Sequence, residues 1–324
     1  MPVLKKPLAS ISLDLDNLWS YLKTHGDAEW ESGPSYLPLV VPRVLRILDE
    51  KQIKITFFIV GKDAADPGNH EVLRQIVQAG HEIGNHSYHH EPWLHLYSKE
   101  DIDKELAKAE TAIAAATGVI PRGFRGPGFS VSPEVLAVLA QRGYLYDAST
   151  FPTFLGPLAR AYYFATARTF TASEKIQRRR LFGSLAEGRR PITPYDWKTS
   201  AGSILEIPVT TMPIVKLPIH LSYILYLGLY SRWLARTYFA SATHLCRWTG
   251  SDISLLLHPL DFLGKDDVDR LSFFPAMKIS AAQKLSLVDS LLDMMKSHFQ
   301  LVTMREHAAH ISARKRRRVQ SIGQ

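Results

Sequence analysis

Short apolar runs alternate with longer helical patterns along most of the chain, and this alternation constrains the fold more than any other feature. The predicted strands are 9–16, 54–60, 123–125, 204–209, 253–258 and 300–304. The predicted helices are 38–51, 70–80, about 98–117, a helix that starts after Ser132-Pro133, and about 280–297. Strands that alternate with helices usually pair in parallel, so the pattern predicts an α/β fold whose sheet is open or closed into a barrel.

Two regions depart from this alternation. Residues 151–203 contain several prolines and the basic runs 178–180 and 189–190, which is typical of a long excursion from the core. Residues 217–240 are apolar and aromatic, but their uninterrupted apolar stretch is shorter than the ~20 residues of a membrane-spanning helix. This aromatic segment fits either a helix lying in a membrane interface or a helix packed over the mouth of a barrel.

The net charge of +8 is concentrated at the C-terminus, where residues 314–318 are all Lys or Arg. Such a run fits either a solvated tail or a contact with an anionic membrane surface. We expect one domain over 1–310, with an insertion at about 151–203 and an amphipathic aromatic segment at about 213–245. A basic tail over 311–324 completes the expected organisation.

Cysteine usage and the N-terminus limit the chemistry and the compartment. The single cysteine, Cys246, excludes an internal disulfide and a cysteine-based zinc cage, so any metal site needs His and carboxylate ligands. The first residues include two lysines and lack the apolar stretch of a signal peptide. We therefore expect a cytoplasmic protein, with the inner face of the membrane as its place of peripheral attachment.

Asp14 and Asp16 lie near the C-terminal end of the first predicted strand, two positions apart. Side chains at this spacing point to the same face of a strand. The carboxyl ends of parallel strands are where α/β folds place their sites. One aspartate could bind a metal while the other takes a proton, although a pair of exposed loop aspartates would show the same pattern.

His86 and His90 are separated by four positions, which on one helical turn would let both imidazoles bind one ion. A histidine-rich surface turn is the simpler alternative. Together with Asp16 they would form a set of two histidines and one carboxylate with open positions for water and substrate. A metal held in this way polarises a carbonyl and lowers the pKa of bound water, as hydrolysis of an amide requires.

At several places in order the chain resembles the polysaccharide deacetylase family (NodB homology, carbohydrate esterase 4). The resembling segments are Leu-Asp-Leu-Asp-Asn at 13–17, Gly-Asn-His-Ser-Tyr-His-His at 84–90, Phe-Arg-Gly-Pro-Gly-Phe-Ser at 124–130 and Leu-Leu-Leu-His-Pro at 255–259. Four ordered motifs are more specific than any one of them. The family fold is an irregular (β/α) barrel of about seven strands, which we expect here with the accessory region inserted.

The resemblance also implies roles for individual residues. Asp16, His86 and His90 would bind one divalent metal, usually zinc in this family. Asp14 would be the general base, and Arg125 would orient Asp14 by a charge-assisted hydrogen bond. His258 would be the general acid that protonates the leaving amine. Leu15 separates the two aspartates that are adjacent in the commonest form of the motif, so this chain resembles an Asp-x-Asp subgroup that includes deacylases of lipid-linked sugars and some cyclic-amide hydrolases.

Further residues are candidates for binding the substrate or supporting the site. They are Trp19, Pro127, Gly128, Phe129, Tyr146, Asp147 and Glu206. Asp147 could equally support His258 or Arg125 or belong to a structural turn, and Glu206 could face solvent at a strand end. Asp261 could orient His258. Trp19 could stack on a sugar or pack in the core.

The sequence predicts metal-dependent hydrolysis of an N-acetyl or N-formyl amide on an amino sugar. The substrate would belong to an envelope or exopolysaccharide pathway and could be linked to polyprenyl phosphate, with residues 217–240 and 314–318 contacting anionic lipid. One alternative is a cyclic imide or ureide hydrolase of the same fold, and another is a non-catalytic relative that binds glycan or lipid. Nucleic acid is the weakest candidate partner, because no aromatic residues interleave the basic run.

Overall fold

The computed structural model of the chain describes residues 6–158, 161, 185–314 and 317–321. Its strands are β1 (Leu8–Leu15), β2 (Thr56–Ile59), β3 (Glu82–Asn85), β4 (Gly123–Phe124), β5 (Tyr146–Asp147), β6 (Tyr195–Thr199), β7 (Gly202–Glu206), β8 (Ile253–Leu257), β9 (Gln300–Val302) and β10 (Arg318–Ser321). Their order in the sheet is β10-β6-β7-β5-β4-β3-β2-β1-β8, with β9 beside β1. Every pair is parallel except β6 with β7, as the alternation of strands and helices predicts.

Residues 207–210, directly after β7, bond on one side to the segment that follows β5 and on the other side to β8, the last strand of this order. The backbone N–H of Val209 donates to the carbonyl of Thr150 at 2.9 Å, and that of Thr210 donates to the carbonyl of Ser254 in β8 at 3.1 Å. β1, β2, β3, β4, β5, β7 and β8 are thereby joined around a ring, with isolated hydrogen bonds in place of a strand ladder at the last junction. This arrangement agrees with the predicted irregular barrel of about seven strands.

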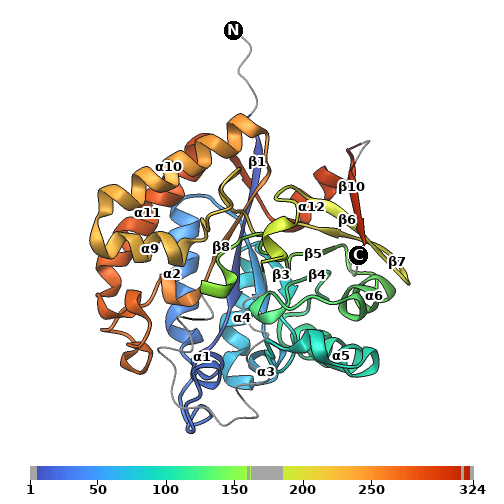
Figure 1. Cartoon of the computed structure of the whole chain (residues 1–324). Coiled ribbons are helices and arrows are strands. Elements are labelled where there is room, and N and C mark those ends of the chain that lie inside the picture. Colours follow the sequence, from blue (N-terminus) through green and yellow to red (C-terminus); the bar gives the residue numbers. More distant parts are fainter. Residues whose placement is uncertain (1–5, 159–160, 162–184, 315–316, 322–324) are drawn as a thin grey trace.

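Two strands of the sheet extend it beyond the ring, at the right of Figure 1. β6 lies in the predicted accessory region 151–203 and forms an antiparallel hairpin with β7. β10 lies in the predicted basic tail and pairs in parallel with β6. Arg317 also donates to Asp196 at 2.7 Å, so the described end of the tail contacts the sheet. The basic run 178–180 and residues 315–316 lie outside the described residues.

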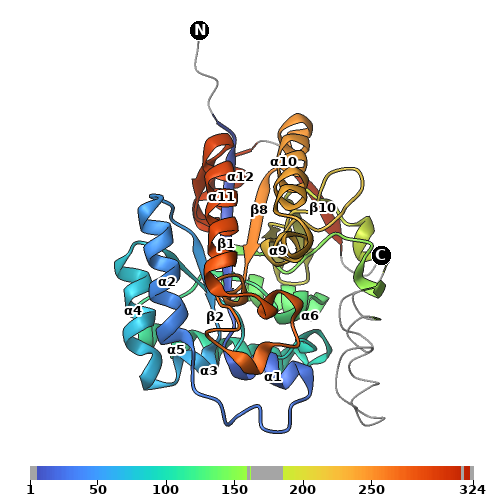
Figure 2. The same cartoon turned by 90° about the vertical axis from the view of Figure 1, so that its left-hand side faces the viewer.

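The helices pack around the outside of the ring (Figures 1 and 2). They are α1 (Leu18–His25), α2 (Leu37–Glu50), α3 (Gly61–Ala64), α4 (His70–Gln78), α5 (Lys99–Thr117), α6 (Pro133–Gln141), α9 (Leu221–Tyr230), α10 (Arg232–Thr249), α11 (Ala281–His298) and α12 (Met304–Ser312). Three of the predicted helices begin at serines whose hydroxyls accept a backbone N–H of the first turn, at Ser98, Ser132 and Ser280. The predicted helices are therefore present within a few residues of their expected bounds.

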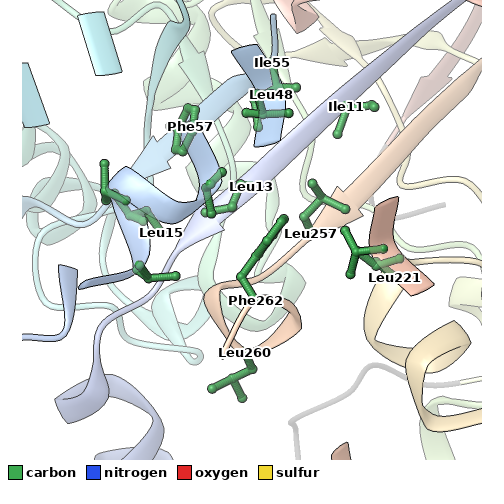
Figure 3. Packing of buried hydrophobic residues seen from close by; sticks show 14 of the residues in the cluster. Ile11, Leu13, Leu15, Leu48, Ile55, Phe57, Leu221, Leu257, Leu260 and Phe262 are labelled. Carbon is green, nitrogen blue, oxygen red and sulfur yellow. The ribbon is translucent and has the colours of Figure 1, made fainter. Parts of the chain in front are cut away.

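β1 shows how one strand separates the apolar core from the interior of the barrel. Ile11, Leu13 and Leu15 are buried in the main hydrophobic core, between the sheet and the surrounding helices (Figure 3). The alternate side chains, which include Ser12 and Asp14, point to the other face and are also buried. The serine leaves room for a larger polar side chain, so the barrel interior beside Asp14 can be polar.

The aromatic segment 217–240 contains the whole of α9 and the start of α10, because the helical conformation is interrupted at Ser231. This residue has extended backbone angles (φ −160°, ψ 119°), and its side chain accepts the N–H of Leu234 at the start of α10. Leu221 and Ile224 are buried in the main core, so α9 packs on the barrel. Within the described residues, no helix has both the length and the apolar character needed to cross a membrane.

Candidate active site with a metal centre

The register of the parallel strands brings the predicted residues to one rim of the barrel. β1, β2, β3 and β4 are aligned in one row at Leu15, Ile59, Asn85 and Phe124. Asp16, His86 and Arg125 are the next residues of β1, β3 and β4 in the chain. β1 and β8 are paired up to Leu13 and Leu257, so the next residues, Asp14 and His258, lie side by side at this rim. The carboxyl ends of the strands therefore bring the candidate metal ligands, the candidate base and the candidate acid close to one another.

Arg125 reaches into the interior of the barrel and is fully buried. One guanidinium nitrogen, Nη1, donates to Asp14 Oδ1 and to Ser12 Oγ, both at 2.9 Å, and Nε donates to the carbonyl of Ala148 at 3.0 Å. The guanidinium carbon lies 4.6 Å from the centre of the Phe58 ring. These contacts hold Asp14 in one orientation, which is the arrangement expected of an orienting arginine.

Asp16, His86 and His90 are buried, and their candidate ligand atoms all lie within 4.8 Å of one another. Nε2 of His90 is 2.9 Å from Asp16 Oδ1, and Nε2 of His86 is 3.4 Å from the same oxygen. Nε2 of His86 is also 4.0 Å from Oδ2 of Asp14. The base candidate therefore adjoins the three candidate ligands.

The two histidines are brought together by an irregular turn, so the single helical turn predicted from their spacing is wrong. Ser87 and His90 have φ of 58° and 52°, in the left-handed region. Oε1 of Glu105, on α5, accepts the N–H groups of Tyr88 and His89 at 3.0 and 2.6 Å. A buried side chain thus takes the hydrogen bonds that a helix would have made within itself.

The donor set fits a divalent cation. Oδ1 of Asp16 is buried and accepts no hydrogen bond from the residues that the structure describes. Nδ1 of His86 lies 2.7 Å from the backbone carbonyl of Arg125; when it donates this bond, Nε2 presents its lone pair towards Asp16. Burial acts to raise the pKa of Asp16, but His90 and His86 outweigh it and hold that pKa well below its usual range. An ionised carboxylate with two imidazoles suits zinc and several other divalent ions.

His258 is half-buried at the same rim and is oriented by a short hydrogen-bonded chain. The Oγ of Ser222 donates to Asp261 Oδ1 at 2.7 Å and lies 3.2 Å from Nδ1 of His258. Because the hydroxyl proton points to Asp261, the oxygen accepts from Nδ1–H of the imidazole. The backbone N–H of His258 also donates to Asp261 Oδ2 at 2.8 Å. Nε2 is therefore the ring nitrogen left to exchange a proton with a substrate.

A cavity of about 640 Å³ adjoins His258. Tyr223 and Tyr226 of α9 contribute to its wall, as does the short 3-10 turn η7 (Pro275–Lys278). Two of the predicted substrate-binding residues, Gly128 and Phe129, also line it, and the Phe129 ring stacks on Phe151 with centroids 5.0 Å apart. The aromatic segment predicted to touch a membrane or the barrel mouth thus helps to form the wall of this cavity.

Pro127 and Trp19 occupy supporting positions instead of the described cavity wall. Pro127 is buried in the 3-10 turn η3 (Pro127–Phe129). Trp19 is also buried; its ring meets that of His90 edge-on at 6.3 Å, and its Nε1 donates to Asp63 Oδ1 at 2.9 Å. The side chain of Asn17 donates to the same Asp63 oxygen at 2.7 Å. Trp19 therefore packs behind a candidate metal ligand.

Tyr146, Asp147 and Glu206 are fully buried beside the ring and do not line the described cavity. Burial, reinforced by Asp147, raises the pKa of Glu206 well above its usual range. Ser149 Oγ donates to Asp147 at 2.5 Å and accepts the N–H of Gly126, the neighbour of Arg125, at 2.7 Å. Asp147 consequently supports the backbone next to the orienting arginine.

The sequence-based prediction did not single out His220, Ser222, Asp63 or Glu105. His220 and Ser222 interrupt an apolar run just before and within α9, and polar residues in such a run were the available signal. His220 is buried, and its ring lies 5.8 Å from that of His258, centre to centre. Asp63 and Glu105 carried no comparable signal, because their roles depend on tertiary contacts.

Comparison with known proteins matches part of this chain to one family. Residues 29–146 match the family model described as polysaccharide deacetylase. This segment contains His86, His90 and Arg125, and it confirms the resemblance proposed from the motifs. Asp14, Asp16 and His258 lie outside it, so their assignment depends on the geometry described above.

Two curated relatives illustrate the similarity. A Helicobacter pylori peptidoglycan deacetylase is 28% identical over 152 residues, which is 45% of this chain and 50% of that protein. A Sinorhizobium fredii chitooligosaccharide deacetylase is 32% identical over 115 residues, which is 35% of this chain and 51% of that protein. The matches thus span about half the length of these relatives.

Solved structures show the same fold over the whole chain. A candidate polysaccharide deacetylase from Mycobacterium smegmatis has a TM-score of 0.62 at 21% identity, covering 100% of this chain and 95% of that chain. The Puue allantoinase has a TM-score of 0.58 at 16% identity, covering 97% and 93%. At these identities the likeness establishes the architecture alone.

Proposed function

We propose that this chain, whose residues 29–146 belong to the polysaccharide deacetylase family, hydrolyses the N-acetyl or N-formyl amide of an amino sugar with a divalent metal ion. The observation that carries the proposal is the meeting of Asp14, His258 and the three candidate ligands at one rim. Amide hydrolysis needs a polarised carbonyl, a base for water and an acid for the leaving amine. The names of the two relatives support an amino-sugar substrate.

The hydrogen bonds at the site support each proposed role. Asp16, His86 and His90 would hold the ion, which when bound polarises the amide carbonyl and acidifies water. Arg125 fixes Oδ1 of Asp14, so Oδ2 is the oxygen placed to take the proton of the attacking water. His258 gives the proton on Nε2 to the amine nitrogen as the C–N bond breaks, and Ser222 accepts from Nδ1–H throughout.

The finer part of this proposal is a substrate linked to polyprenyl phosphate, reached at the cytoplasmic face of a membrane. Tyr230 and Trp233, at the junction of α9 and α10, are 72% and 74% exposed. Ile214 is 74% exposed in the preceding loop, and Arg236 is exposed on α10. Amphipathic rings beside arginines suit the interface of a bilayer with anionic headgroups, which supports peripheral attachment.

The catalytic proposal is tested by metal content and by release of acetate or formate from lipid-linked and nucleotide-linked N-acyl sugars. We expect one metal ion per wild-type chain, loss of metal in His86→Ala, and retention of metal without acyl release in Asp14→Asn. The exposed residues His310 and Asp293 provide matched controls, His310→Ala and Asp293→Asn, which should behave as wild type. A wild-type protein that holds metal but releases no acid from any amino sugar would contradict the reaction.

Membrane attachment is tested by flotation with vesicles that contain phosphatidylglycerol. Wild type should float with these vesicles and less with neutral ones, and Trp233→Ser should reduce flotation. The matched control Ile120→Ser removes an apolar side chain that is 56% exposed in the loop before β4 and should change nothing. Equal recovery of the wild type with and without vesicles would exclude the attachment.

A further inference from the structure

The cavity beside His258 is too large for the small acyl group of the proposed reaction. Its volume is about 640 Å³, within the range of roughly 300–1,000 Å³ that holds drug-sized ligands. Phe129, Phe151, Leu155, Leu260, Tyr223 and Met277 supply much of its described lining. An acetyl group has only a few heavy atoms, so most of this apolar space must serve another part of the substrate.

Apart from the proposed acid His258, the described wall carries no unpaired charge. Its lining includes no Lys or Arg among the residues that the structure describes. Glu187 pairs with Arg190 at 2.9 Å, and Asp261 is held by Ser222 and by the backbone of His258. Burial, followed by the nearby His258, holds the pKa of His220 well below its usual range, so this imidazole is neutral. Apart from the proposed acid His258, the described wall would therefore offer a phosphate no cation to bind.

Several polar groups of the wall are already bonded within the protein. Ser130 Oγ accepts the backbone N–H of His95 at 2.7 Å and lies 2.8 Å from its Nδ1. Thr153 Oγ1 accepts the N–H of Leu155 at 3.2 Å. Among the described lining residues, Tyr21 Oη and Nδ1 of His220 are buried without a hydrogen bond, so several sugar hydroxyls placed here would lose water and share few partners, which costs free energy. An apolar group loses nothing by the same transfer.

We propose that this cavity is a subsite for an apolar chain of the substrate, carried either as the N-acyl group or as the aglycone of the amino sugar. This inference rests on the proposed function, because the reacting amide at His258 is what places the chain beside α9 and η7. It differs from the membrane contact proposed above, which uses side chains on the outer surface of the same segment. The subsite would select amphiphilic substrates over soluble polymers.

The test measures binding to the metal-loaded Asp14→Asn protein by calorimetry, so that no turnover intervenes. One arm compares methyl and octyl glycosides of N-acetylglucosamine, and the other compares N-acetyl and N-octanoyl glucosamine as methyl glycosides. A fully buried methylene strengthens binding by roughly fourfold, so we expect the octyl or octanoyl ligand to bind at least about tenfold more tightly than its short counterpart. The arm that shows the gain identifies the source of the chain.

A variant that fills the cavity tests whether the gain in affinity arises there. Ala276, half-buried in η7, lines the cavity, and Ala276→Trp should abolish the preference for the long chain. The control Ala201→Trp changes an exposed residue in the turn between β6 and β7 and should keep the preference. Equal affinity for short and long ligands in both arms, or a preference that survives Ala276→Trp, overturns the subsite. Acyl release from the short methyl glycoside by protein with Asp14 intact reports separately on the proposed function.

Discussion

The two halves of the barrel contribute to the site in different ways. The first half, from β1 to β5, supplies the candidate ligands and Asp14, and Arg125 holds two of them, His86 and Asp14, by buried hydrogen bonds. The second half, from β7 to β8, supplies His258, Ser222 and much of the apolar cavity wall. The difference teaches that the reacting groups are fixed by short motifs at strand ends, whereas substrate selection depends on segments inserted between strands.

The largest expected effect tests how tightly the first half is held. Arg125→Met should lower the free energy of unfolding by about 3–5 kcal/mol, because it leaves Asp14 buried without its partner. Urea unfolding measures this loss. The double variant Arg125→Met with Asp14→Asn should recover part of it, since the uncompensated charge is then gone. A single variant as stable as wild type would show that the pair is not buried in solution.

The second prediction concerns the pH dependence of stability in the same half of the barrel, at the amino end of β3. Burial, followed by Lys54, lowers the pKa of His81 to about 4, and its Nδ1 accepts the N–H of Ile55. Because the unfolded chain binds a proton near pH 6.5 and the folded chain does not, stability should fall by about 2 kcal/mol as pH drops from 6.5 to 4. His81→Asn keeps an acceptor without titrating, so urea unfolding at the two pH values should show a smaller fall. The control His310→Asn, at an exposed site, should lose as much stability between the two pH values as wild type. If His81→Asn also loses as much as wild type, the pH dependence comes from other groups.

The third prediction separates positioning from binding in the second half. Ser222→Ala removes the group that accepts from Nδ1–H of His258, so kcat should fall roughly tenfold while KM stays unchanged. The control Ser272→Ala, at an exposed position, should leave both constants as in wild type. A change in KM alone would mean that Ser222 contacts the substrate instead.

The smallest effect is expected at the C-terminal tail. The side chain of Arg314, which is 39% exposed, donates to Asp252 beside β8. Arg314→Ala should lower the free energy of unfolding by no more than about 1 kcal/mol, as is usual for exposed ion pairs. A loss above about 2 kcal/mol in urea unfolding would show that the tail stabilises the barrel as strongly as its interior does.

Much of the fold could be predicted because parallel strands and helices have different periods. The register then follows from burial: shifting β1 by one residue would exchange Leu13 for Asp14 in the apolar core. That argument places Asp14 and Asp16 at the carboxyl end of β1, whereas the register that brings His86 and Arg125 to the same rim comes from the structure. The family motifs added their roles, which the strand pattern does not contain.

The remaining features depend on tertiary contacts that periodicity does not encode. The ring closes through residues 207–210 without a regular ladder, so no strand pattern marks the junction. The turn between His86 and His90 is held by Glu105, which lies on α5 and is distant from the turn in sequence. The break at Ser231 had a local signal, a serine before a new helical run, but a continuous apolar composition obscured it. Trp19 could be read as a sugar platform because its packing behind His90 is invisible in the sequence.

Arg125 has a consequence for how the site responds to thermal motion. Its backbone carbonyl meets Nδ1 of His86, and its guanidinium meets Oδ1 of Asp14. A fluctuation that shifts β4 therefore carries the ligand candidate and the base candidate in the same direction. Their displacements are correlated, so the spacing between His86 and Asp14 varies less than either position does. The barrel can fluctuate as a whole while the separation between the candidate base and this candidate metal ligand changes less.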